Sequence, residues 1–188
     1  PQLAQAIKNT LLISTLNILF CFPMPIVFAL LLNEVMHKYF KKSIQTLTYL
    51  PHFISWVIIG GLAKMALAYD GGIVNNIVTA FGGEKTSFLT EEKYFYPILI
   101  VLTIWKETGW GTIIYIAAIS GIDSTLYEAA KIDGCKRFGL IWRITLPCIL
   151  PTIATMLIMR IANIMNAGFD PVYNLYNKTI YSVADIID

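Results

Sequence analysis

Long apolar runs separated by short charged segments form the dominant pattern of this chain. Residues 9–33 contain no charged side chain, and a transmembrane helix needs about 20 predominantly apolar residues. Helices satisfy every backbone polar group inside a bilayer, so the pattern predicts an all-α integral membrane protein. The predicted transmembrane helices cover residues 9–33, 43–66, 94–119 and 147–169.

Prolines and charges interrupt these runs. Pro23 and Pro25 lie inside the first run, where we expect a kink. Lys106 and Glu107 interrupt the third run, and Arg160 interrupts the fourth. An ionisable side chain at membrane depth costs about 2.5–3.5 kcal/mol or more. We therefore expect these three side chains to face the interior of a helix bundle or an aqueous cavity.

The composition agrees with a membrane protein. Of the 188 residues, 56% are hydrophobic and 14% are charged, whereas soluble domains carry about 25% charged residues. The net charge of +2 is too small to indicate a nucleic-acid partner. The three cysteines show neither a pairing pattern nor a metal-ligand spacing. The chain opens at Pro1 and stops at Asp188 within its helical pattern, so we expect residues 1–188 to be a fragment of one transmembrane domain.

Basic residues predict which ends of the helices face the cytoplasm. Four basic side chains follow the first run between residues 37 and 42, and four more lie between residues 131 and 143. Both segments are therefore predicted inside. Residues 70–93 carry four acids and two lysines and are predicted outside, with a short helix over residues 73–81 lying on the outer face.

A charged, helix-forming segment lies between the third and fourth runs. Ser124 is a suitable N-cap for a short helix, and Gly134 can adopt the positive φ that ends one. A second short helix is predicted from Lys136 to Thr145, up to Pro147. The segment is therefore expected to form two short helices that lie parallel to the membrane and are joined at a glycine.

This segment resembles a known motif. Glu128-Ala129-Ala130-Lys131-Ile132-Asp133-Gly134, continuing to Ile144-Thr145-Leu146-Pro147, is similar to the EAA loop, E-A-A-x-x-D-G-(A)-x(8)-I-x-L-P, of type I ABC importer permeases. The one departure is Cys135, where the family prefers alanine. The resemblance implies a maltose-permease-like helical bundle with a coupling loop over residues 121–146.

In the family this loop docks on a nucleotide-binding subunit. The resemblance implies that Glu128 contacts the ATPase and that Ala129 and Ala130 allow its close approach. It also implies that Gly134 makes the turn, and we expect Asp133 to cap the second helix.

The intramembrane charges have two interpretations from the residues alone. Trp105 and Trp110 flank Lys106 and Glu107, and aromatic faces beside hydrogen-bonding groups suit sugar rings. Polar and charged side chains also hold membrane helices together, and Glu107 pairing with Arg160 across helices is such an alternative.

The resemblance adds a prediction of the substrate path, because sugar-contacting positions of maltose-type permeases flank the EAA loop. Two of the three intramembrane charges are basic, which favours an acidic oligosaccharide such as a uronate. Counted from Glu128, the predicted path residues are Lys106, Glu107, Trp110, Arg160, Asn163, Ile164 and Ala167.

His52 follows Pro51 near the start of the second run and has no second histidine near it. We interpret it as a structural residue and predict no metal site. The sequence shows no nucleophile–base pair and no phosphate-binding glycine loop, so we predict a transport subunit and not an enzyme.

The predicted function is that of a permease subunit of an ATP-driven importer, forming the path for a sugar or oligosaccharide. The same scaffold importing amino acids, peptides or anions is the first alternative, and a membrane enzyme or scaffold without a transport role is the second. The resemblance implies no bound cofactor, because ATP is bound by the partner ATPase. It implies a multi-pass protein of the plasma membrane whose partners are cytoplasmic ABC ATPase subunits, a second permease subunit, an extracellular solute-binding protein, the sugar and the lipid bilayer.

Overall fold

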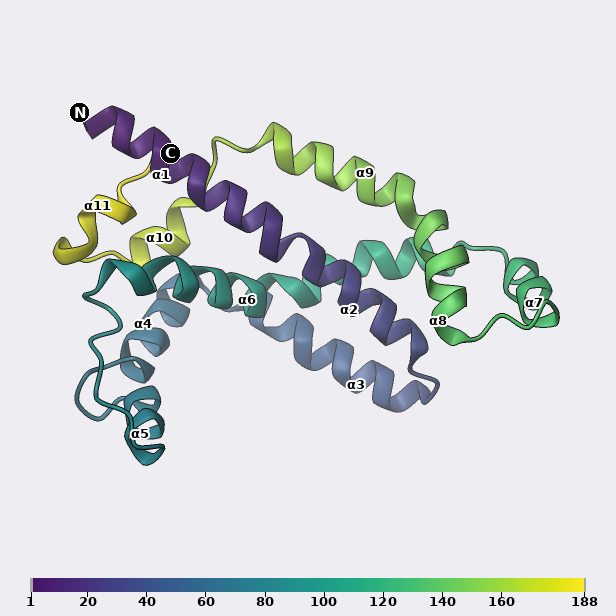
Figure 1. Cartoon of the computed structure of the whole chain (residues 1–188), viewed down its shortest axis with the longest axis horizontal. Coiled ribbons are helices and arrows are strands. Elements are labelled where there is room, and N and C mark those ends of the chain that lie inside the picture. The colour runs from purple at the N-terminus through teal and green to yellow at the C-terminus, as the bar shows by residue number, and fades with distance from the viewer. Residues whose placement is uncertain (1, 188) are drawn as a thin grey trace.

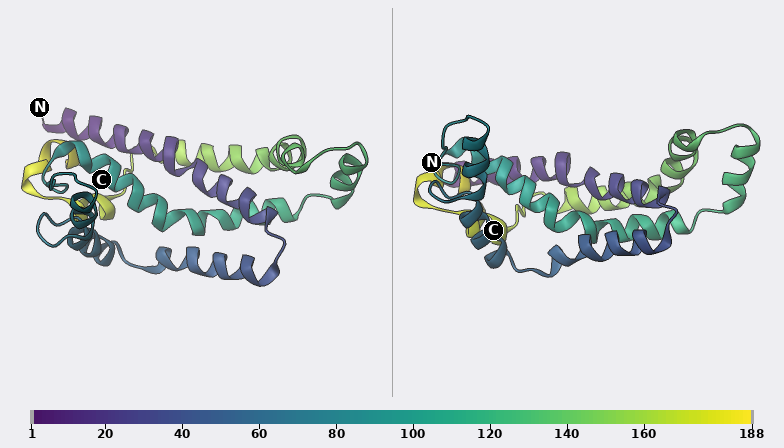
Figure 2. Two further views of the ribbon diagram at one scale, coloured as in Figure 1. Left: turned by 60° about the horizontal axis from the view of Figure 1, so that its bottom comes forward. Right: turned by 90° about the horizontal axis from the view of Figure 1, so that it is seen from below.

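The computed structural model describes residues 2–187, and this part of the chain contains helices and no β-strand. The molecule is elongated, with long helices along its length and short helices gathered at both ends (Figure 1). The helix α7 (Ser124–Ile132) projects at one end, as the two turned views in Figure 2 also show. The opposite end holds α5 (Ile73–Ala80) and α11 (Tyr181–Ala184).

The first apolar run forms one long helical span. It consists of α1 (Gln2–Leu16), the π-helical turn η1 (Asn17–Cys21) and α2 (Pro23–Glu34). The π-helical turn lies just before Pro23, where we expected a kink, and at its end the N–H of Phe22 donates to the carbonyl of Asn17 at 3.0 Å. Local π-helical turns are one way in which membrane helices accommodate a proline, which has no N–H to donate.

The second run is not the single helix predicted over residues 43–66. It consists of α3 (Lys38–Tyr49), the 3₁₀ turn η2 (Leu50–Phe53) and α4 (Trp56–Ala66), and α4 is bent by 98° from the helix before it. Ile54 and Ser55 are extended, and the Ser55 hydroxyl accepts from the N–H of Ile58. Because Ser55 is the N-cap of a new helix, the chain leaves the first helical path at this point. We call residues 50–55 the elbow.

The third run is the central helix of the molecule. α6 (Glu92–Ser120) packs along both α2 and α3. A Cβ added at Gly109 would lie 2.0 Å from the carbonyl oxygen of Thr48, and one at Gly111 would lie 3.0 Å from Cγ of Pro25. The two glycines therefore allow α3 and α2 to approach α6 closely, and a larger residue at position 109 would force α3 away.

The last long helix begins earlier than predicted. α8 (Arg137–Leu140), the π-helical turn η3 (Ile141–Thr145) and α9 (Leu146–Ala162) form one continuous helix, so no separate short helix ends at Pro147. Pro147 lies in the first turn of α9, directly after the π-helical turn. This helix ends at Ala162, short of the predicted residue 169, and Gly168 at φ 85° precedes the short helix α10 (Phe169–Leu175).

Two helices in the described chain are long and apolar enough to cross a membrane, Leu3–Glu34 and Arg137–Ala162. The bent pair Lys38–Phe53 and Trp56–Ala66 makes a third if it is counted as one span. The sequence predicted four spans. α6, with Lys106 and Glu107 at its centre, has the length of a span but not the composition that defines the others.

Polar side chains organise the end of the molecule that holds both described termini. Asn9 donates to the carbonyls of Ser182 and Asp185, each at 2.9 Å, and so joins α1 to the last residues of the chain. The buried Asn75 donates to the carbonyls of Ala68 and Thr86, and its own oxygen accepts from the N–H of Thr86. The predicted short helix over residues 73–81 is present there as α5.

Candidate functional site

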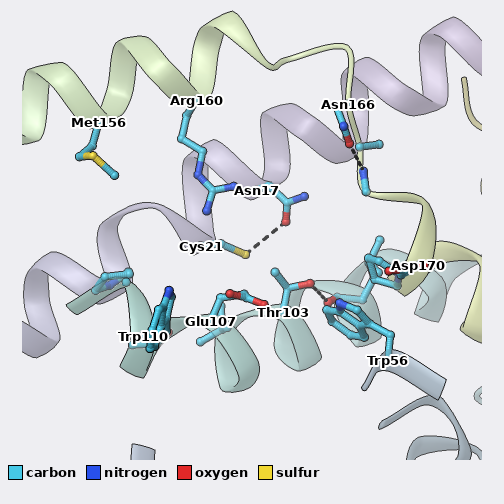
Figure 3. A pocket seen from close by; sticks show the side chains of 18 of the residues that line it. Asn17, Cys21, Trp56, Thr103, Glu107, Trp110, Met156, Arg160, Asn166 and Asp170 are labelled. Atoms are coloured by element: carbon cyan, nitrogen blue, oxygen red, sulfur yellow. Dashed lines mark hydrogen bonds between the residues drawn. The ribbon is translucent and has the colours of Figure 1, made fainter. Parts of the chain in front are cut away.

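A cavity of about 960 Å³ lies between the long helices, at the height where the charges interrupt the apolar runs. Side chains enter it from η1, α6 and α9, and the segment from Asn166 to Pro171 closes one end (Figure 3). Its wall is mixed: two tryptophans, two acids, one arginine and several small or aliphatic residues. The polar and aromatic lining residues are Asn17, Cys21, Trp56, Thr103, Glu107, Thr108, Trp110, Arg160, Asn166, Phe169 and Asp170.

Four of the seven predicted path residues line this cavity, namely Glu107, Trp110, Arg160 and Ala167. Lys106, Asn163 and Ile164 do not belong to its lining. α9 ends at Ala162, so Asn163 and Ile164, which were placed in the path by counting from Glu128, lie in the turn that follows the helix. The Asn163 amide donates to the carbonyl of Met159 at 2.8 Å, closing the end of that helix.

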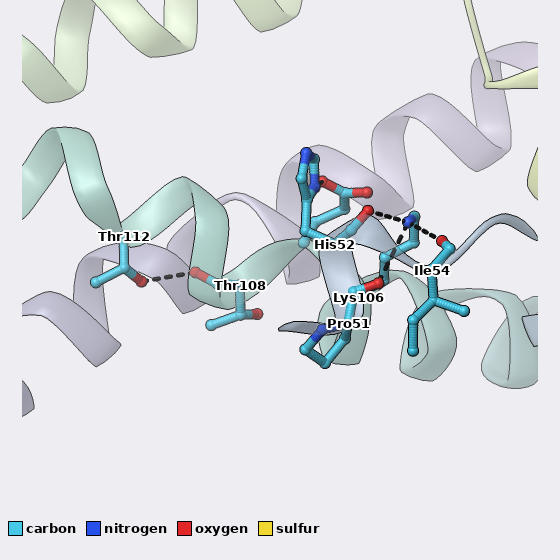
Figure 4. Close-up of polar contacts among 7 residues, drawn as sticks. Pro51, His52, Ile54, Lys106, Thr108 and Thr112 are labelled. Atoms are coloured by element: carbon cyan, nitrogen blue, oxygen red, sulfur yellow. Dashed lines mark hydrogen bonds and ion pairs between the residues drawn. The ribbon is translucent and has the colours of Figure 1, made fainter. Parts of the chain in front are cut away.

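Lys106 corrects the prediction that all three intramembrane charges face the cavity. Its side chain is only 6% exposed, and its ammonium donates to the carbonyls of Pro51, His52 and Ile54 at 3.4, 2.6 and 2.6 Å (Figure 4). These carbonyls belong to the elbow, where the helical path is broken between η2 and α4; that of Pro51 also accepts from the N–H of Ile54 at 3.1 Å. A buried ammonium needs such acceptors, so Lys106 holds the elbow against α6.

Glu107 contacts the same elbow through a side chain. Oε2 of Glu107 lies 3.0 Å from Nδ1 of His52. The His52 ring is stacked on Trp110, with 4.6 Å between ring centroids and 1° between ring planes, and the ring of Phe53 meets Trp110 edge to face. His52 therefore has partners for both its ring edge and its ring face within the protein, and no local sequence pattern identifies its polar partner Glu107.

Arg160 enters the cavity from α9 and points toward η1 (Figure 3). Within residues 2–187 its guanidinium forms no hydrogen bond and has no carboxylate within 4.0 Å. The alternative pairing of Glu107 with Arg160 is therefore absent from this structure, because Glu107 is engaged by His52. The cavity thus contains a cation for which residues 2–187 provide no counter-ion within 4.0 Å.

The sequence prediction missed most of the polar and aromatic residues that line the cavity, among them Asn17 and Trp56. Asn17 is in the π-helical turn, and its Oδ1 lies 3.3 Å from Sγ of Cys21. An amide in the middle of a long uncharged run is a signal that could have identified it. Trp56 reaches the cavity only because the elbow turns α4 aside, and no sequence signal indicated that bend.

The predicted coupling residues lie at the far end of the molecule from α5 (Figure 1). Gly134 has φ 79°, and the N–H groups of Gly134 and Cys135 donate to the carbonyls of Lys131 and Ala130 at 3.0 and 2.9 Å. This is the Schellman arrangement that a glycine after a helix permits, so the predicted turn at Gly134 is present. Glu128, Ala129 and Asp133 are exposed, while Ala130 is half-buried.

Two predicted caps of this segment are corrected. The N-cap of α7 is Asp123 and not Ser124, because the Asp123 carboxylate accepts from the N–H of Thr125 at 2.9 Å. Asp133 does not cap the next helix; it ends α7, and α8 begins after Lys136 without a side-chain cap. Accepting this hydrogen bond from the Thr125 backbone lowers the pKa of Asp123 below its usual value.

The chain has helices long and apolar enough for a bilayer and a central cavity between them. It also has an exposed segment with the EAA spacing, residues 121–146, which we call the coupling segment. Together these features are those of a helical membrane protein of the transport class. The chain belongs to the family of binding-protein-dependent transport system inner membrane components, whose profile matches residues 10–171. This membership confirms the predicted class of permease.

Named relatives extend the comparison. The polygalacturonan/rhamnogalacturonan transport system permease protein YteP of Bacillus subtilis (strain 168) is 49% identical over 188 residues, covering 100% of this chain and 59% of the relative. The lactose transport system permease protein LacF of Rhizobium radiobacter is 32% identical over 181 residues, covering 95% of this chain and 60% of the relative. The chain thus spans about three-fifths of the length of the curated relatives it matches.

A solved structure shows the same fold. A chain in the crystal structure of a bacterial ABC transporter involved in the import of the acidic polysaccharide alginate has a TM-score of 0.96 and 48% identity. The match covers 99% of this chain and 65% of that chain. The predicted importer-permease fold class is therefore confirmed.

Proposed function

We propose that this chain is part of the permease subunit of an ATP-driven carbohydrate importer and that the cavity between η1, α6 and α9 is its substrate path. The observation that carries the proposal is the lining of the cavity, where Trp56 and Trp110 supply aromatic walls and Arg160 supplies an unpaired cation. Family membership and relatives named for carbohydrate transport support it.

The partners follow from this role. Glu128, Ala129, Ala130, Asp133 and Gly134 are proposed to dock on a cytoplasmic ABC ATPase subunit, and ATP is bound by that partner. A second permease subunit completes the path, and an extracellular solute-binding protein delivers the substrate. A crystal structure of a bacterial alginate ABC transporter in complex with alginate pentasaccharide-bound periplasmic protein supports the last partner. The protein is proposed to be a multi-pass protein of the plasma membrane.

The substrate class is an acidic oligosaccharide. Lys106 is buried against the elbow carbonyls and therefore supplies no cation to the cavity. Arg160 remains, and a guanidinium recognises a carboxylate through two parallel hydrogen bonds. The relatives named for polygalacturonan and for alginate, both polymers of acidic sugars, support this class. Import of amino acids, peptides or other anions by the same scaffold is the rival function.

Uptake by the complete transporter in proteoliposomes tests the proposal. A galacturonate pentasaccharide should enter in a manner that requires both the binding protein and ATP, and amino acids and peptides should not. Arg160→Gln should lower this uptake by about tenfold or more, the loss expected for one charge-assisted hydrogen bond.

Thermal unfolding of the assembled transporter supplies the control. Arg160 has no ion-pair partner within residues 2–187, so Arg160→Gln should leave the unfolding temperature unchanged. Arg160→Lys keeps the positive charge but not the planar guanidinium, so its pentasaccharide uptake should lie between that of wild type and that of Arg160→Gln. Unchanged pentasaccharide uptake in Arg160→Gln would reject the assigned role of this residue.

A further inference from the structure

His52 is the residue of the elbow on which two adjacent α6 side chains converge. The Lys106 ammonium donates a hydrogen bond to the backbone carbonyl of His52, and the Glu107 carboxylate is hydrogen-bonded to the His52 imidazole. The stack on Trp110 fixes the plane of the ring. The main chain, ring edge and ring face of His52 are thus all engaged, so the imidazole is held in one position against Glu107 and Trp110, two residues that line the cavity.

The direction of the hydrogen bond between His52 and Glu107 depends on the protonation of the two groups. When Glu107 is ionised it can only accept hydrogen bonds, so the Nδ1–H tautomer of His52 is then the donor to Oε2 of Glu107. Nearly a third of each side chain remains exposed, at 29% for His52 and 32% for Glu107. Glu107 therefore still belongs to the cavity wall, with one of its oxygens held by His52.

Glu107 is also a potential competitor for Arg160. Both side chains line the same cavity, and Cys21 lies between them in Figure 3. The remaining charged lining residue, Asp170, forms no ion pair with Arg160 within 4.0 Å. Opposite charges attract more strongly inside a protein than in water, and a carboxylate is the preferred partner of a guanidinium. A Glu107 carboxylate without another partner would neutralise the cation that the substrate needs.

We infer that His52 determines specificity by holding Glu107 away from Arg160, which leaves the guanidinium free for a carboxylate of an acidic oligosaccharide. His52 is a positioning residue that acts through Glu107. The inference rests on the proposed function, since it requires that Arg160 bind an anionic sugar in this cavity.

A double-mutant cycle on the complete transporter tests the inference. The probes are a galacturonate pentasaccharide and its carboxyl-reduced, neutral counterpart of the same length. His52→Phe retains an aromatic ring against Trp110 and removes the donor to Glu107. With Glu107 present, this change should lower pentasaccharide uptake by about tenfold or more. In a Glu107→Gln background, where no carboxylate remains to capture Arg160, the same change should alter uptake by less than about twofold.

The neutral counterpart separates positioning from structure. If His52 acts only through Glu107 and Arg160, His52→Phe should change uptake of the neutral sugar by less than about twofold. A purely structural role predicts an equal loss for both sugars and no rescue by Glu107→Gln, and either result would overturn the inference. Equal uptake of the acidic sugar by His52→Phe and wild type would overturn it as well.

Two further measurements keep the test decisive. Assembly of each variant is measured by co-purification of the subunits. If His52→Phe does not assemble, His52→Leu, which also lacks the donor to Glu107, replaces it in the same comparison. Wild-type transporter that imports neither pentasaccharide contradicts the proposed function itself, whereas wild-type import of the acidic sugar with an additive cycle contradicts only the role of His52.

Discussion

The coupling segment and the cavity are built in opposite ways. The coupling segment uses neighbours in sequence: Asp123 caps the helix that it precedes, Gly134 closes it, and Tyr127 reaches Thr145 at 2.9 Å. The cavity uses segments as distant as Asn17 and Asp170. Its shape depends on the bend at the elbow and on the close approach of α3 to α6 at Gly109.

This difference determines how each region responds to change. The coupling segment projects from the body of the molecule, so a disturbance there should affect docking and leave the helices assembled. The cavity shares its walls with the packing of the protein, so many changes there should alter stability as well as transport. Arg160 is the exception, because it lines the cavity without a protein partner in the described residues.

The largest expected effect tests whether the elbow is a structural element. Lys106→Met removes the ammonium that donates to three elbow carbonyls, of which only that of Pro51 keeps a backbone donor, the N–H of Ile54. An unsatisfied buried acceptor costs about 1–3 kcal/mol. Thermal unfolding of the assembled transporter should show a clear loss of stability, with the preference for acidic over neutral sugar unchanged. Lys64→Met on the exposed side of α4 is the matched control and should unfold like wild type. A shift in sugar preference without a loss of stability would contradict this structural role and indicate that Lys106 contacts the substrate.

A smaller and more local effect tests the coupling turn. A Cβ at Gly134 meets no atom within 4 Å, so any penalty comes from its φ of 79°. A left-handed conformation costs an L-residue about 1–2 kcal/mol, which Gly134→Val would introduce within this turn. Co-purification with the ATPase and uptake should fall, while membrane insertion and bundle stability persist.

Gly134→Asn is the matched control for this turn, because asparagine tolerates positive φ. It should retain more ATPase association than the valine variant. Normal uptake and normal substrate-stimulated ATP hydrolysis in Gly134→Val would remove Gly134 from the docking role.

The smallest expected effect concerns the cap of α7. The Asp123 pKa is lowered in the folded protein by the hydrogen bond from Thr125. The stabilisation is therefore present above the unfolded pKa and is lost as the pH falls through the folded pKa. Protection of the first α7 amides from hydrogen exchange should decrease in acid for wild type, but not for Asp123→Asn, whose amide oxygen caps without titrating. Equal acid dependence in both proteins would show that Asp123 does not cap the helix.

Elements governed by local rules could be predicted from the amino-acid order. Apolar runs indicated a helical membrane protein, and the short helix at residues 73–81 and the turn at Gly134 are where they were expected. Choosing between adjacent cap residues failed, because Asp123 and Ser124 are both good N-caps and only the backbone conformation distinguishes them. Counting from Glu128 by the family resemblance also placed Asn163 and Ile164 in the path, although α9 ends before them and they do not line the cavity.

The partners of the charged residues depended on how the helices pack. The cost of burying a charge predicted that Lys106, Glu107 and Arg160 each need a polar environment. It did not identify the partner of each side chain. Neighbouring residues on α6 point in different directions, so Lys106 meets elbow carbonyls while Glu107 meets the imidazole of His52. That elbow exists because Ser55 starts a helix in a new direction, and Gly109 lets α3 lie against α6. Sequence order alone determines the need of each charge for a partner; contacts between residues about 55 positions apart determine the partner itself.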